Sequence, residues 1–419
     1  MVEPALRPRS SRSGEEAPVD SPVSTPQDKT TARVSVGKLF SPQSSTYYLL
    51  LGTTIFLVLI GLVMVLSASS VDSWLDDKGF FGGFWKQATF AVIGIPLMLI
   101  ISRFSLEFWK KWAWVLLGIT LMLQLLVFTP LGIEDGGNRN WISLGVFTAQ
   151  PSEAVKLALC IWLGVVLGRK YNMLDNWRHV VIPVVPVSIV ALGLVQLGHD
   201  LGTVMIMAVL VFGGLFFANV KLRYLAVPIL LAGVAVIFFV MTSQNRTDRI
   251  GSFLEEGCAD YNGLCWQPLH GTWALANGGV FGLGLGNSRE KFSWLPAASN
   301  DYIFAIIGEE LGLIGAIVVL ALFTLLTIGF IRVIRSATDP MVRITTGAIL
   351  VWIVGQALVN IAVVLRLLPV LGVPLPLLSQ GGTALITSLA AIGVVLSFAR
   401  GQSQNNMREA SVVSAQKSE

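Results

Sequence analysis

The chain has 419 residues, of which 54% are apolar and only 13% carry a charged side chain, and its net charge is +4. A soluble fold of this length is excluded, because soluble domains cover their surface with roughly 25% charged residues. The small positive charge includes no basic stripe with interleaved aromatic rings, which excludes nucleic acid as a partner. Three cysteines are too few for a disulfide scaffold or a cysteine zinc cluster. The remaining class is a polytopic membrane protein.

Apolar stretches divide the chain into three parts. Residues 1–45 are rich in Ser, Pro, Thr and charge, which predicts a disordered cytoplasmic tail. Residues 46–400 hold about ten apolar stretches, each long enough to cross a ~30 Å hydrocarbon core as a helix. Residues 401–419 form a second cytoplasmic tail. The expected fold is all-α, with transmembrane helices at 47–69, 82–102, 109–131, 150–168, 179–197, 201–220, 222–241, 301–331, 344–366 and 381–399.

The distribution of charge predicts the orientation of these helices. If the N-terminus is cytoplasmic, the cytoplasmic segments hold more Lys and Arg than the outer ones, even without the long tail. Both termini are therefore expected in the cytoplasm. Acidic residues favour the outer side, so chemistry is expected there. Three outer segments stand out, at 132–153, 243–300 and 367–383, and the second is one large extracytoplasmic loop of 58 residues.

The first outer segment leads into a helix with polar residues in its first turn. Pro151 is a favourable first helical residue, and the helix dipole favours Glu153 in the first turn. Glu153 and Lys156 are i,i+3 neighbours and can form an ion pair. A capped helix start with a snorkelling lysine explains this pattern without a function. The functional interpretation is an anion site made from Arg139 and Lys156.

The large loop contains a glycine-rich run from Phe281 to Ser288 that superficially looks like a phosphate-binding loop. It lacks the strand before and the Gly-Lys-Ser/Thr sequence after, so a nucleotide site is not expected. Alternation of glycine with apolar residues instead predicts a tight loop with close backbone packing.

Two cysteines, Cys258 and Cys265, lie in the same outer loop, in the compartment where disulfides persist. We predict a disulfide between them, which would stabilise the short loop by a few kcal/mol at most. Two free thiols are the alternative. The third cysteine, Cys160, lies inside a span and is expected to pack as an ordinary apolar residue.

Acidic residues recur where the large loop enters the next span. Asp301 lies at the outer mouth of this span, and Glu309 lies about 12 Å deeper at the rise of a helix. Adjacent Glu309 and Glu310 are costly in an apolar run unless they face a polar cavity or a partner. A helix N-cap is the alternative explanation for Asp301. Asp200 forms another polar cluster, and dense Pro and Gly at 374–383 predict an irregular segment that lines a cavity.

Five of these segments carry short motifs, namely Asn138-Arg139-Asn140-Trp141-Ile142, Gln150-Pro151-Ser152-Glu153 with Lys156, Asp200-Leu201-Gly202-Thr203, Leu295-Pro296 through Asp301-Tyr302-Ile303-Phe304 to Gly308-Glu309-Glu310-Leu311-Gly312, and Ser379-Gln380-Gly381-Gly382. In this order they resemble the SEDS family, the shape, elongation, division and sporulation proteins FtsW and RodA. The resemblance covers roughly residues 45–400 and is closer to FtsW. Departures at Ala298, Tyr302 and 380–384 affect the shape of the outer cavity but remove no ionisable group.

The resemblance implies a peptidoglycan glycosyltransferase of the bacterial cytoplasmic membrane, active at the division septum. Its substrate would be lipid II, an undecaprenyl-pyrophosphate-linked disaccharide pentapeptide, and its partners a class B penicillin-binding protein and other division proteins. Asp301 matches the catalytic aspartate of the family, so we expect it to act as general base on a GlcNAc 4-hydroxyl, with inversion at the donor. A lipid II flippase is the alternative function. A scaffold would explain the tail but not Asp301 and Arg139.

The departing pyrophosphate needs positive charge, for which Arg139 and Lys156 are the first candidates and Arg246, Arg289 and Lys291 the second. Glu309 and Glu310 are expected to hold the cavity together or to bind a cation. No cofactor is certain. A divalent cation, Mg²⁺ or Mn²⁺, could bridge the pyrophosphate, but the sequence contains no visible ligand set. The expected substrate-binding residues are Arg139, Trp141, Glu153, Lys156, Asp200, Arg289, Lys291, Ser379, Gly381 and Gly382, with Arg246 as a further candidate.

Overall fold

The structure of the chain is a computed structural model that describes residues 44–77, 79–135, 137–143, 145, 148–254, 261 and 263–416. These residues all belong to one unit, Gln43–Glu419. The tail predicted over residues 1–45 lies almost entirely outside the described residues. The tail predicted over 401–419 continues the last helix as far as Gln416.

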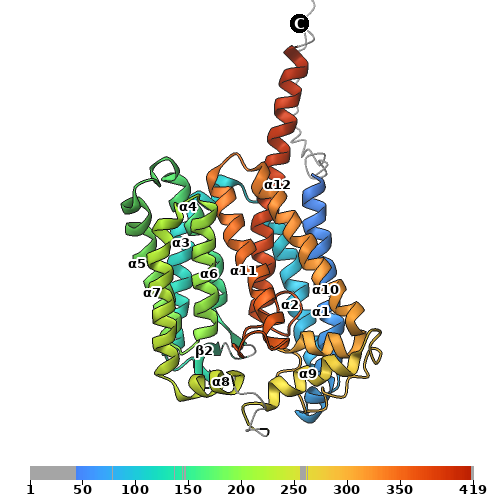
Figure 1. Cartoon of the computed structure of the whole chain (residues 1–419). Helices are drawn as coiled ribbons and strands as arrows, with labels where there is room; N and C mark the ends of the chain where they lie inside the picture. The colour runs from blue at the N-terminus through green and yellow to red at the C-terminus, as the bar shows by residue number, and fades with distance from the viewer. Residues whose placement is uncertain are drawn as a thin grey trace, which may run out of the picture. The chain divides into compact units, whose positions relative to one another are not determined.

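Long apolar helices run alongside one another through this unit (Figure 1). Within the described ranges, nine helices are long and apolar enough to cross a membrane, and α6 is a shorter apolar helix of 17 residues. Each of the ten expected spans corresponds to one of these helices, which confirms the all-α membrane fold. The helices are α1 (Ser45–Leu75), α2 (Gly82–Ile101), α3 (Leu106–Leu125), α4 (Pro151–Arg169), α5 (Trp177–Leu197), α6 (Leu201–Phe217), α7 (Leu222–Met241), α10 (Ile303–Ser336), α11 (Pro340–Val364) and α12 (Gly382–Gln416).

Side chains at the helix starts satisfy backbone N–H groups that have no partner within the helix. Ser44, Ser105 and Asp339 accept hydrogen bonds from the first turns of α1, α3 and α11. Such caps stabilise a helix by about 1 kcal/mol each. Pro151 opens α4, as its position in the sequence predicts. Local capping thus fixes where several spans begin.

The centre of the bundle is formed by α4, α11 and α12. Their most apolar windows are 83%, 67% and 72% buried, whereas that of α7 is only 6% buried. α4 packs against α3, α6 and α11, α12 packs against α2, and α1 packs against α10. Small residues permit the closest of these contacts, since a Cβ added to Gly164 of α4 would lie 1.9 Å from Thr345 Oγ1 of α11.

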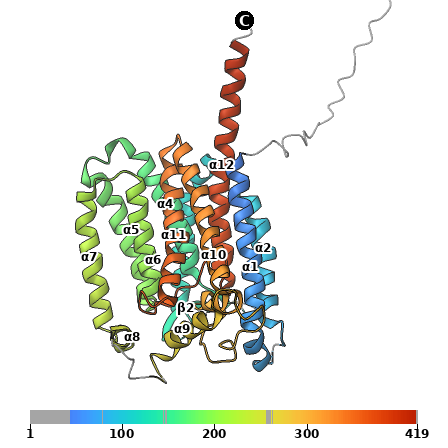
Figure 2. The ribbon, with the colours of Figure 1, turned by 45° about the vertical axis from the view of Figure 1, so that its right-hand side comes forward.

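The three outer segments expected from the sequence lie together at one end of the bundle (Figures 1 and 2). This end holds α8 (Gln244–Leu254), α9 (Trp266–Gly278) and the segment between α11 and α12. It also holds a small antiparallel sheet with strand order β1-β2-β3, which the sequence did not predict. Its strands are β1 (Gly132–Asp135), β2 (Asn138–Ser143) and β3 (Thr148–Ala149). We refer to this end as the site end.

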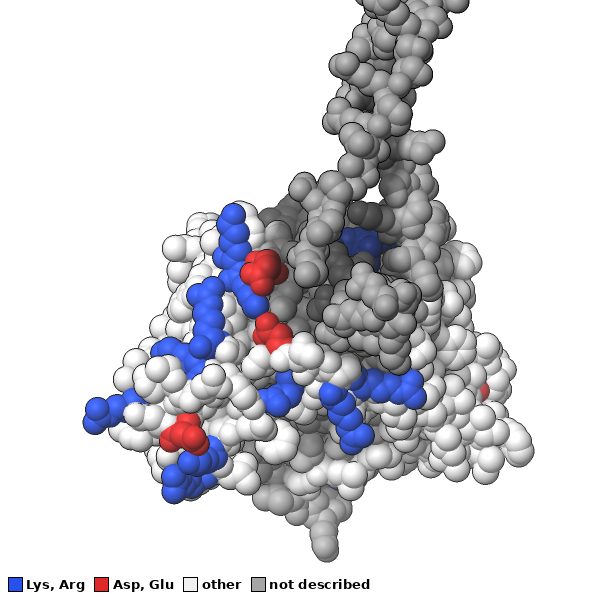
Figure 3. All heavy atoms as spheres, turned by 90° about the horizontal axis from the view of Figure 1, so that it is seen from above, with Lys and Arg blue, Asp and Glu red and all other residues white. Residues whose placement is uncertain are grey.

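The opposite end of the bundle holds the start of α1 and the C-terminal part of α12 (Figures 1 and 2). Seen from this end, Lys and Arg side chains gather over the described surface, with a few Asp and Glu among them (Figure 3). Such a basic end is typical of the cytoplasmic side of a membrane protein. The cytoplasmic position of both termini stays a prediction.

Helix α10 is broken at Gly312, which has a φ of +67° and interrupts the helical hydrogen bonds. The glycine-rich loop predicted to pack closely fills this break. A Cβ added to Gly282 would lie 2.2 Å from the carbonyl oxygen of Glu310. Four backbone hydrogen bonds replace those lost within the helix: Leu283 N–H to Glu309 O (2.9 Å), Gly284 N–H to Glu310 O (3.0 Å), Leu313 N–H to Gly279 O (3.0 Å) and Ile314 N–H to Val280 O (3.3 Å). The loop therefore satisfies several of the backbone groups that the break leaves without a helical partner.

Candidate functional site

Asp301 lies at the site end, directly before the first turn of α10. The N-cap of that helix is Tyr302, and no side chain caps it, so the alternative explanation of Asp301 as an N-cap is wrong. Oδ1 of Asp301 is buried and has no hydrogen-bond partner. Its other carboxylate oxygen faces the backbone at Gly372, where an added Cβ would lie 3.7 Å away. A buried carboxylate oxygen without a partner in the chain needs an explanation, and a catalytic role is one.

Burial raises the pKa of the Asp301 carboxyl to about 6. The nearby charge of Asp200 raises this pKa further, and the guanidinium of Arg249 lowers it. A carboxyl with this pKa is mostly ionised at neutral pH and is a stronger base than an exposed aspartate. The position is therefore suited to accepting a proton.

Asn360 of α11 fixes the backbone on both sides of this carboxylate. Its amide nitrogen donates to the carbonyl oxygens of Asp301, at 2.7 Å, and Val373, at 2.8 Å. Asn360 is 1% exposed, so these hydrogen bonds are shielded from water. A single side chain thereby joins the start of α10 to the segment that follows α11.

The irregular segment predicted at 374–383 is held against the residues that precede Asp301. Ser379, a predicted site residue, donates from its hydroxyl to the Asn300 carbonyl at 2.6 Å. Gln380 N–H donates to the Ser299 carbonyl at 2.9 Å. Gly381 N–H donates to the side chain of Gln87 in α2 at 3.1 Å, and Gly382 is the first residue of α12. The backbone of this segment forms one wall beside Asp301.

Asp200 is the N-cap of α6 and is fully hydrogen-bonded. Thr203 donates to it from its N–H at 2.9 Å and from its hydroxyl at 2.8 Å. The amides of Asn140 and Gln150 donate to the same carboxylate at 2.9 and 3.1 Å. The sequence placed Asp200 in the substrate site, and the structure places its negative charge near Asp301.

Lys156 forms the predicted ion pair with Glu153, which confirms the i,i+3 pairing. The two charged atoms are 2.7 Å apart, and both side chains are almost completely buried. The Lys156 ammonium also donates to Gln356 at 3.1 Å and lies 4.9 Å from the centre of the Trp352 ring. The charge of Lys156 is thus compensated inside the bundle.

Lys291 is likewise paired within the chain. Its ammonium contacts Gly286 O at 2.6 Å, Ser67 Oγ at 3.1 Å and Glu310 at 3.3 Å. Glu309 accepts from the hydroxyl of Ser288 and from the backbone N–H of residue 289 at 3.0 Å. Both glutamates therefore bind the glycine-rich loop. The arrangement is that of a structural cluster.

The remaining predicted residues are spread over the site end. The Arg139 guanidinium donates to the Thr129 carbonyl at 2.8 Å, and Trp141 is half-buried in the same strand, β2. Arg246 donates to the carbonyls of residues 199 and 239, at 2.6 and 3.1 Å. Arg289 is exposed on the glycine-rich loop. The structure brings Asp200 and the 379–382 segment close to Asp301, whereas Lys291, Glu309 and Glu310 belong to the loop cluster.

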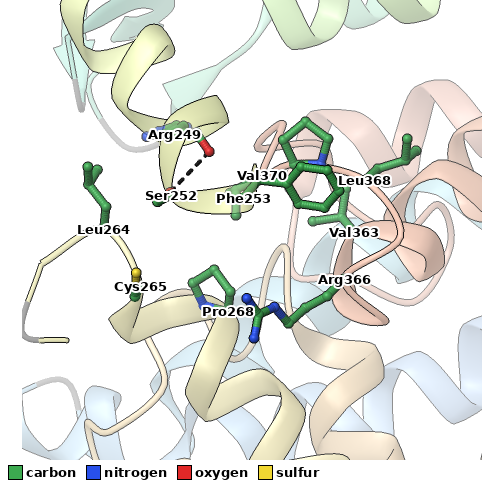
Figure 4. A pocket seen from close by; sticks show the side chains of 11 residues that line it. Arg249, Ser252, Phe253, Leu264, Cys265, Pro268, Val363, Arg366, Leu368 and Val370 are labelled. Carbon is green, nitrogen blue, oxygen red and sulfur yellow. Dashed lines mark hydrogen bonds between the residues drawn. The ribbon is translucent and has the colours of Figure 1, made fainter. Parts of the chain in front are cut away.

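Sequence reasoning missed a pocket at the site end (Figure 4). It lies between α8, the start of α9 and the segment after α11, and Arg249 and Arg366 line it. The sequence does mark one of these arginines, because Arg366 is a single charged residue between an apolar span and a Pro-rich segment. Asn360 was also missed, because an amide inside an apolar span gives no sign of what it contacts.

The predicted divalent cation, Mg²⁺ or Mn²⁺, stays a prediction. No three His, Cys, Asp or Glu side chains among the described residues converge. The carboxylate of Asp200 is already occupied by four donors. We derive no catalytic step through a metal ion.

Of the predicted disulfide, Cys258 lies outside the described residues, so the pairing with Cys265 stays a prediction. Cys160 is a free, buried thiol, as expected for a residue inside a span.

Comparison with known proteins assigns the family. The model of the FtsW, RodA and SpoVE family, described as cell cycle protein, matches residues 47–404. The chain is 34% identical over 369 residues to a probable peptidoglycan glycosyltransferase FtsW of Mycobacterium tuberculosis, covering 88% of this chain and 70% of that protein. It is 36% identical over 361 residues to stage V sporulation protein E of Bacillus subtilis, covering 85% and 98%.

Solved structures share the fold. The rod shape determining protein RodA of Thermus thermophilus matches with a TM-score of 0.63 and 24% identity, over 85% of this chain and 97% of that one. A chain from work on the structural coordination of polymerization and crosslinking by a peptidoglycan synthase complex matches with a TM-score of 0.68 and 23% identity, over 84% and 98%. The match of the family model over most of the bundle and the identity to full-length relatives show that the chain belongs to the FtsW/RodA/SpoVE family, which confirms the resemblance to SEDS proteins.

Proposed function

We propose that this membrane protein is a peptidoglycan glycosyltransferase that polymerises lipid II into glycan strands during septal wall synthesis. The observation that carries the proposal is Asp301, a carboxylate with a buried, unpartnered oxygen and a raised pKa at the site end of the bundle. The relatives named as probable peptidoglycan glycosyltransferases support the reaction class.

In the proposed reaction, the Asp301 carboxylate takes the proton from the 4-hydroxyl of the acceptor GlcNAc. The acceptor oxygen attacks the anomeric carbon of the donor sugar as the bond from that carbon to the pyrophosphate breaks. The electron pair of that bond leaves with the lipid-linked pyrophosphate. A single displacement of this kind inverts the anomeric configuration.

The position of Asp301 suits a substrate with a lipid tail and a sugar head. Asp301 directly precedes α10, a spanning helix, so its carboxylate lies at the membrane boundary. The lipid tail would remain in the bilayer while the sugars reach the site end. The related synthase complex, which coordinates polymerization and crosslinking, supports a class B penicillin-binding protein as the crosslinking partner. Other division proteins complete the proposed assembly at the septum.

Polymerisation of purified lipid II in detergent micelles tests the proposal. The full-length protein, with its transpeptidase partner, is expected to form glycan chains. Asp301→Asn keeps the side-chain size but removes the base, so we expect the rate to fall by about a hundredfold or more. Asp248→Asn is the matched control, because Asp248 is an acid of α8 at the same end, bound to Gln244.

Micelles also separate the two candidate functions, because they offer no second compartment to which lipid II could be moved. Glycan chains in this assay require a polymerase. A wild-type protein that forms none, or an Asp301→Asn variant with full activity, would contradict the proposal. Transport of lipid II across vesicles by a protein that cannot polymerise would favour the flippase.

A further inference from the structure

Most basic side chains at the site end are already engaged by the chain. Lys156 and Lys291 form buried ion pairs with Glu153 and Glu310. The guanidiniums of Arg139 and Arg246 donate to backbone carbonyls. Because these positive charges are already paired, they attract an incoming anion only weakly.

Arg249 and Arg366 differ from these residues. Both are only partly exposed, and within the described part of the chain no carboxylate forms an ion pair with either guanidinium. Their positive charges act instead on the residues at the start of α10. The charge of Arg249 acts to lower the pKa of both Asp301 and Tyr302, and the charge of Arg366 acts to lower the pKa of Tyr302. Two cations without an ion-pair partner among the described residues, both near the start of α10, are unusual in a chain with so few charges.

The two arginines line the same pocket from different elements. Arg249 comes from α8, and Arg366 follows the last turn of α11, with its guanidinium directed toward Pro268 at the start of α9 (Figure 4). The hollow between them is small, about 20 Å³, which is room for a water molecule. An anion would therefore be bound at the rim, by guanidiniums that swing on their flexible side chains.

Two backbone features distinguish this rim, and the first of them favours negative charge. The pocket contains the N-terminal end of α9, a helix of 13 residues whose first turn has no side-chain cap. The partial positive charge of such an end attracts phosphate groups. Arg366 is held at a φ of +55°, a conformation that is costly for a residue with a side chain. The fold thus keeps this arginine in place at an energetic cost.

We infer that Arg249 and Arg366 form a binding site for the pyrophosphate group of the lipid-linked substrate. The inference deepens the proposed function and rests on it for the identity of the ligand. Guanidinium groups bind phosphate oxygens through paired hydrogen bonds, and they would stabilise the charge that develops on the departing pyrophosphate. The sequence analysis gave this role first to Arg139 and Lys156, and we infer that Arg249 and Arg366 take part in it as well.

Binding of undecaprenyl pyrophosphate to the full-length protein in nanodiscs tests the site without requiring catalysis. The Asp301→Asn protein serves as the background, so that binding is separated from turnover. Arg249→Gln and Arg366→Gln are each expected to weaken binding by about ten- to hundredfold, the range for one charge-assisted contact. Arg249→Lys and Arg366→Lys keep the charge but lose the paired hydrogen bonds of a guanidinium. Their affinity for undecaprenyl pyrophosphate should therefore lie between that of the wild-type residue and that of the Gln variant.

Four controls define the ligand and the residues. Lys86→Gln removes an exposed cation from α2 at the same end and should leave binding unchanged. Undecaprenol, which lacks phosphate, should show no dependence on either arginine. Nanodiscs made with phosphatidylglycerol or with phosphatidylcholine separate the substrate from ordinary anionic lipid, and inorganic pyrophosphate added in solution should compete.

The outcomes separate this site from the proposed function. Unchanged binding of undecaprenyl pyrophosphate by both Gln variants would overturn the inference, even if the wild-type protein polymerises lipid II. The inference would also be overturned if the two Gln variants bound phosphatidylglycerol more weakly but bound undecaprenyl pyrophosphate as well as before. Arginine-dependent binding by a protein that forms no glycan would leave the site standing and reject the glycosyltransferase.

Discussion

At the scale of single residues, burial and two neighbouring charges set the pKa of the Asp301 carboxyl. The charge of Asp200 raises the pKa of the Asp301 carboxyl and that of Arg249 lowers it, while burial has the largest effect. Asp200 is itself saturated by hydrogen bonds from Asn140, Gln150 and Thr203. Its contribution to the reaction is therefore electrostatic, and it can be varied separately from the base.

The pH dependence of polymerisation should follow the ionisation of Asp301. The active form of the base is the carboxylate, so kcat/KM should fall as the pH drops through about 6, by about tenfold per pH unit well below it. Asp200→Asn removes the negative charge that raises the pKa but keeps a residue that caps helices well. The acidic limb of the pH profile should then move to lower pH. An unchanged limb in this variant would show that another group is being titrated.

Asn360 is a positioning residue for the same carboxylate. Asn360→Asp replaces the amide that donates to the carbonyls of residues 301 and 373 with an acceptor. We expect kcat to fall by about ten- to hundredfold, with a smaller change in the binding of undecaprenyl pyrophosphate, because buried hydrogen bonds are lost near the base. Asn219→Asp, at the other end of the bundle, is the control. Equal losses of binding and turnover would mean that Asn360 is only structural.

At the scale of elements, the break in α10 and the loop that fills it form one unit. Gly282 has a φ of +80°, and an added Cβ would meet a backbone carbonyl at 2.2 Å. Gly286 has a similar φ of +81°, but nothing lies within 4 Å of an added Cβ. The two glycines therefore separate the cost of conformation from the cost of close packing.

Thermal unfolding in detergent measures this difference. Gly286→Ala should lower the stability by about 1–2 kcal/mol, the cost of a left-handed conformation. Gly282→Ala adds a clash with backbone, which cannot rotate away, and should be clearly less stable than Gly286→Ala. Equal melting temperatures of the two variants would argue against the close approach of Gly282 to the Glu310 carbonyl.

At the scale of the whole molecule, the bundle separates a basic end from the site end. The predicted orientation can be tested with single cysteines introduced at exposed positions after the three native cysteines are replaced by alanine. A membrane-impermeant thiol reagent should label Thr272→Cys of α9 in intact cells. It should label Met173→Cys, between α4 and α5, only after the membrane is opened. The reverse pattern would place the proposed active site in the cytoplasm.

The spans and the Glu153–Lys156 pair could be predicted because each depends on residues close in sequence. Hydropathy predicts a spanning helix of about 20 residues, and i,i+3 spacing predicts which side chains are neighbours on its surface. The partners of Lys291 and Asn360 could not be predicted, because they come from segments 224 and 59 residues away. Arg249 and Arg366 were overlooked for the same reason, since only the packing of α8 against the end of α11 brings them to one pocket.

The break at Gly312 also has a mechanical consequence. The longer part of α10, beyond Gly312, packs against α1 and spans the bilayer, whereas the short part that follows Asp301 is held by the glycine-rich loop and by Asn360. The same loop also binds the long part, because Leu313 and Ile314 donate to the carbonyls of Gly279 and Val280. A tilt of the long part with bilayer thickness or tension would therefore be passed through the loop to the short part that follows Asp301.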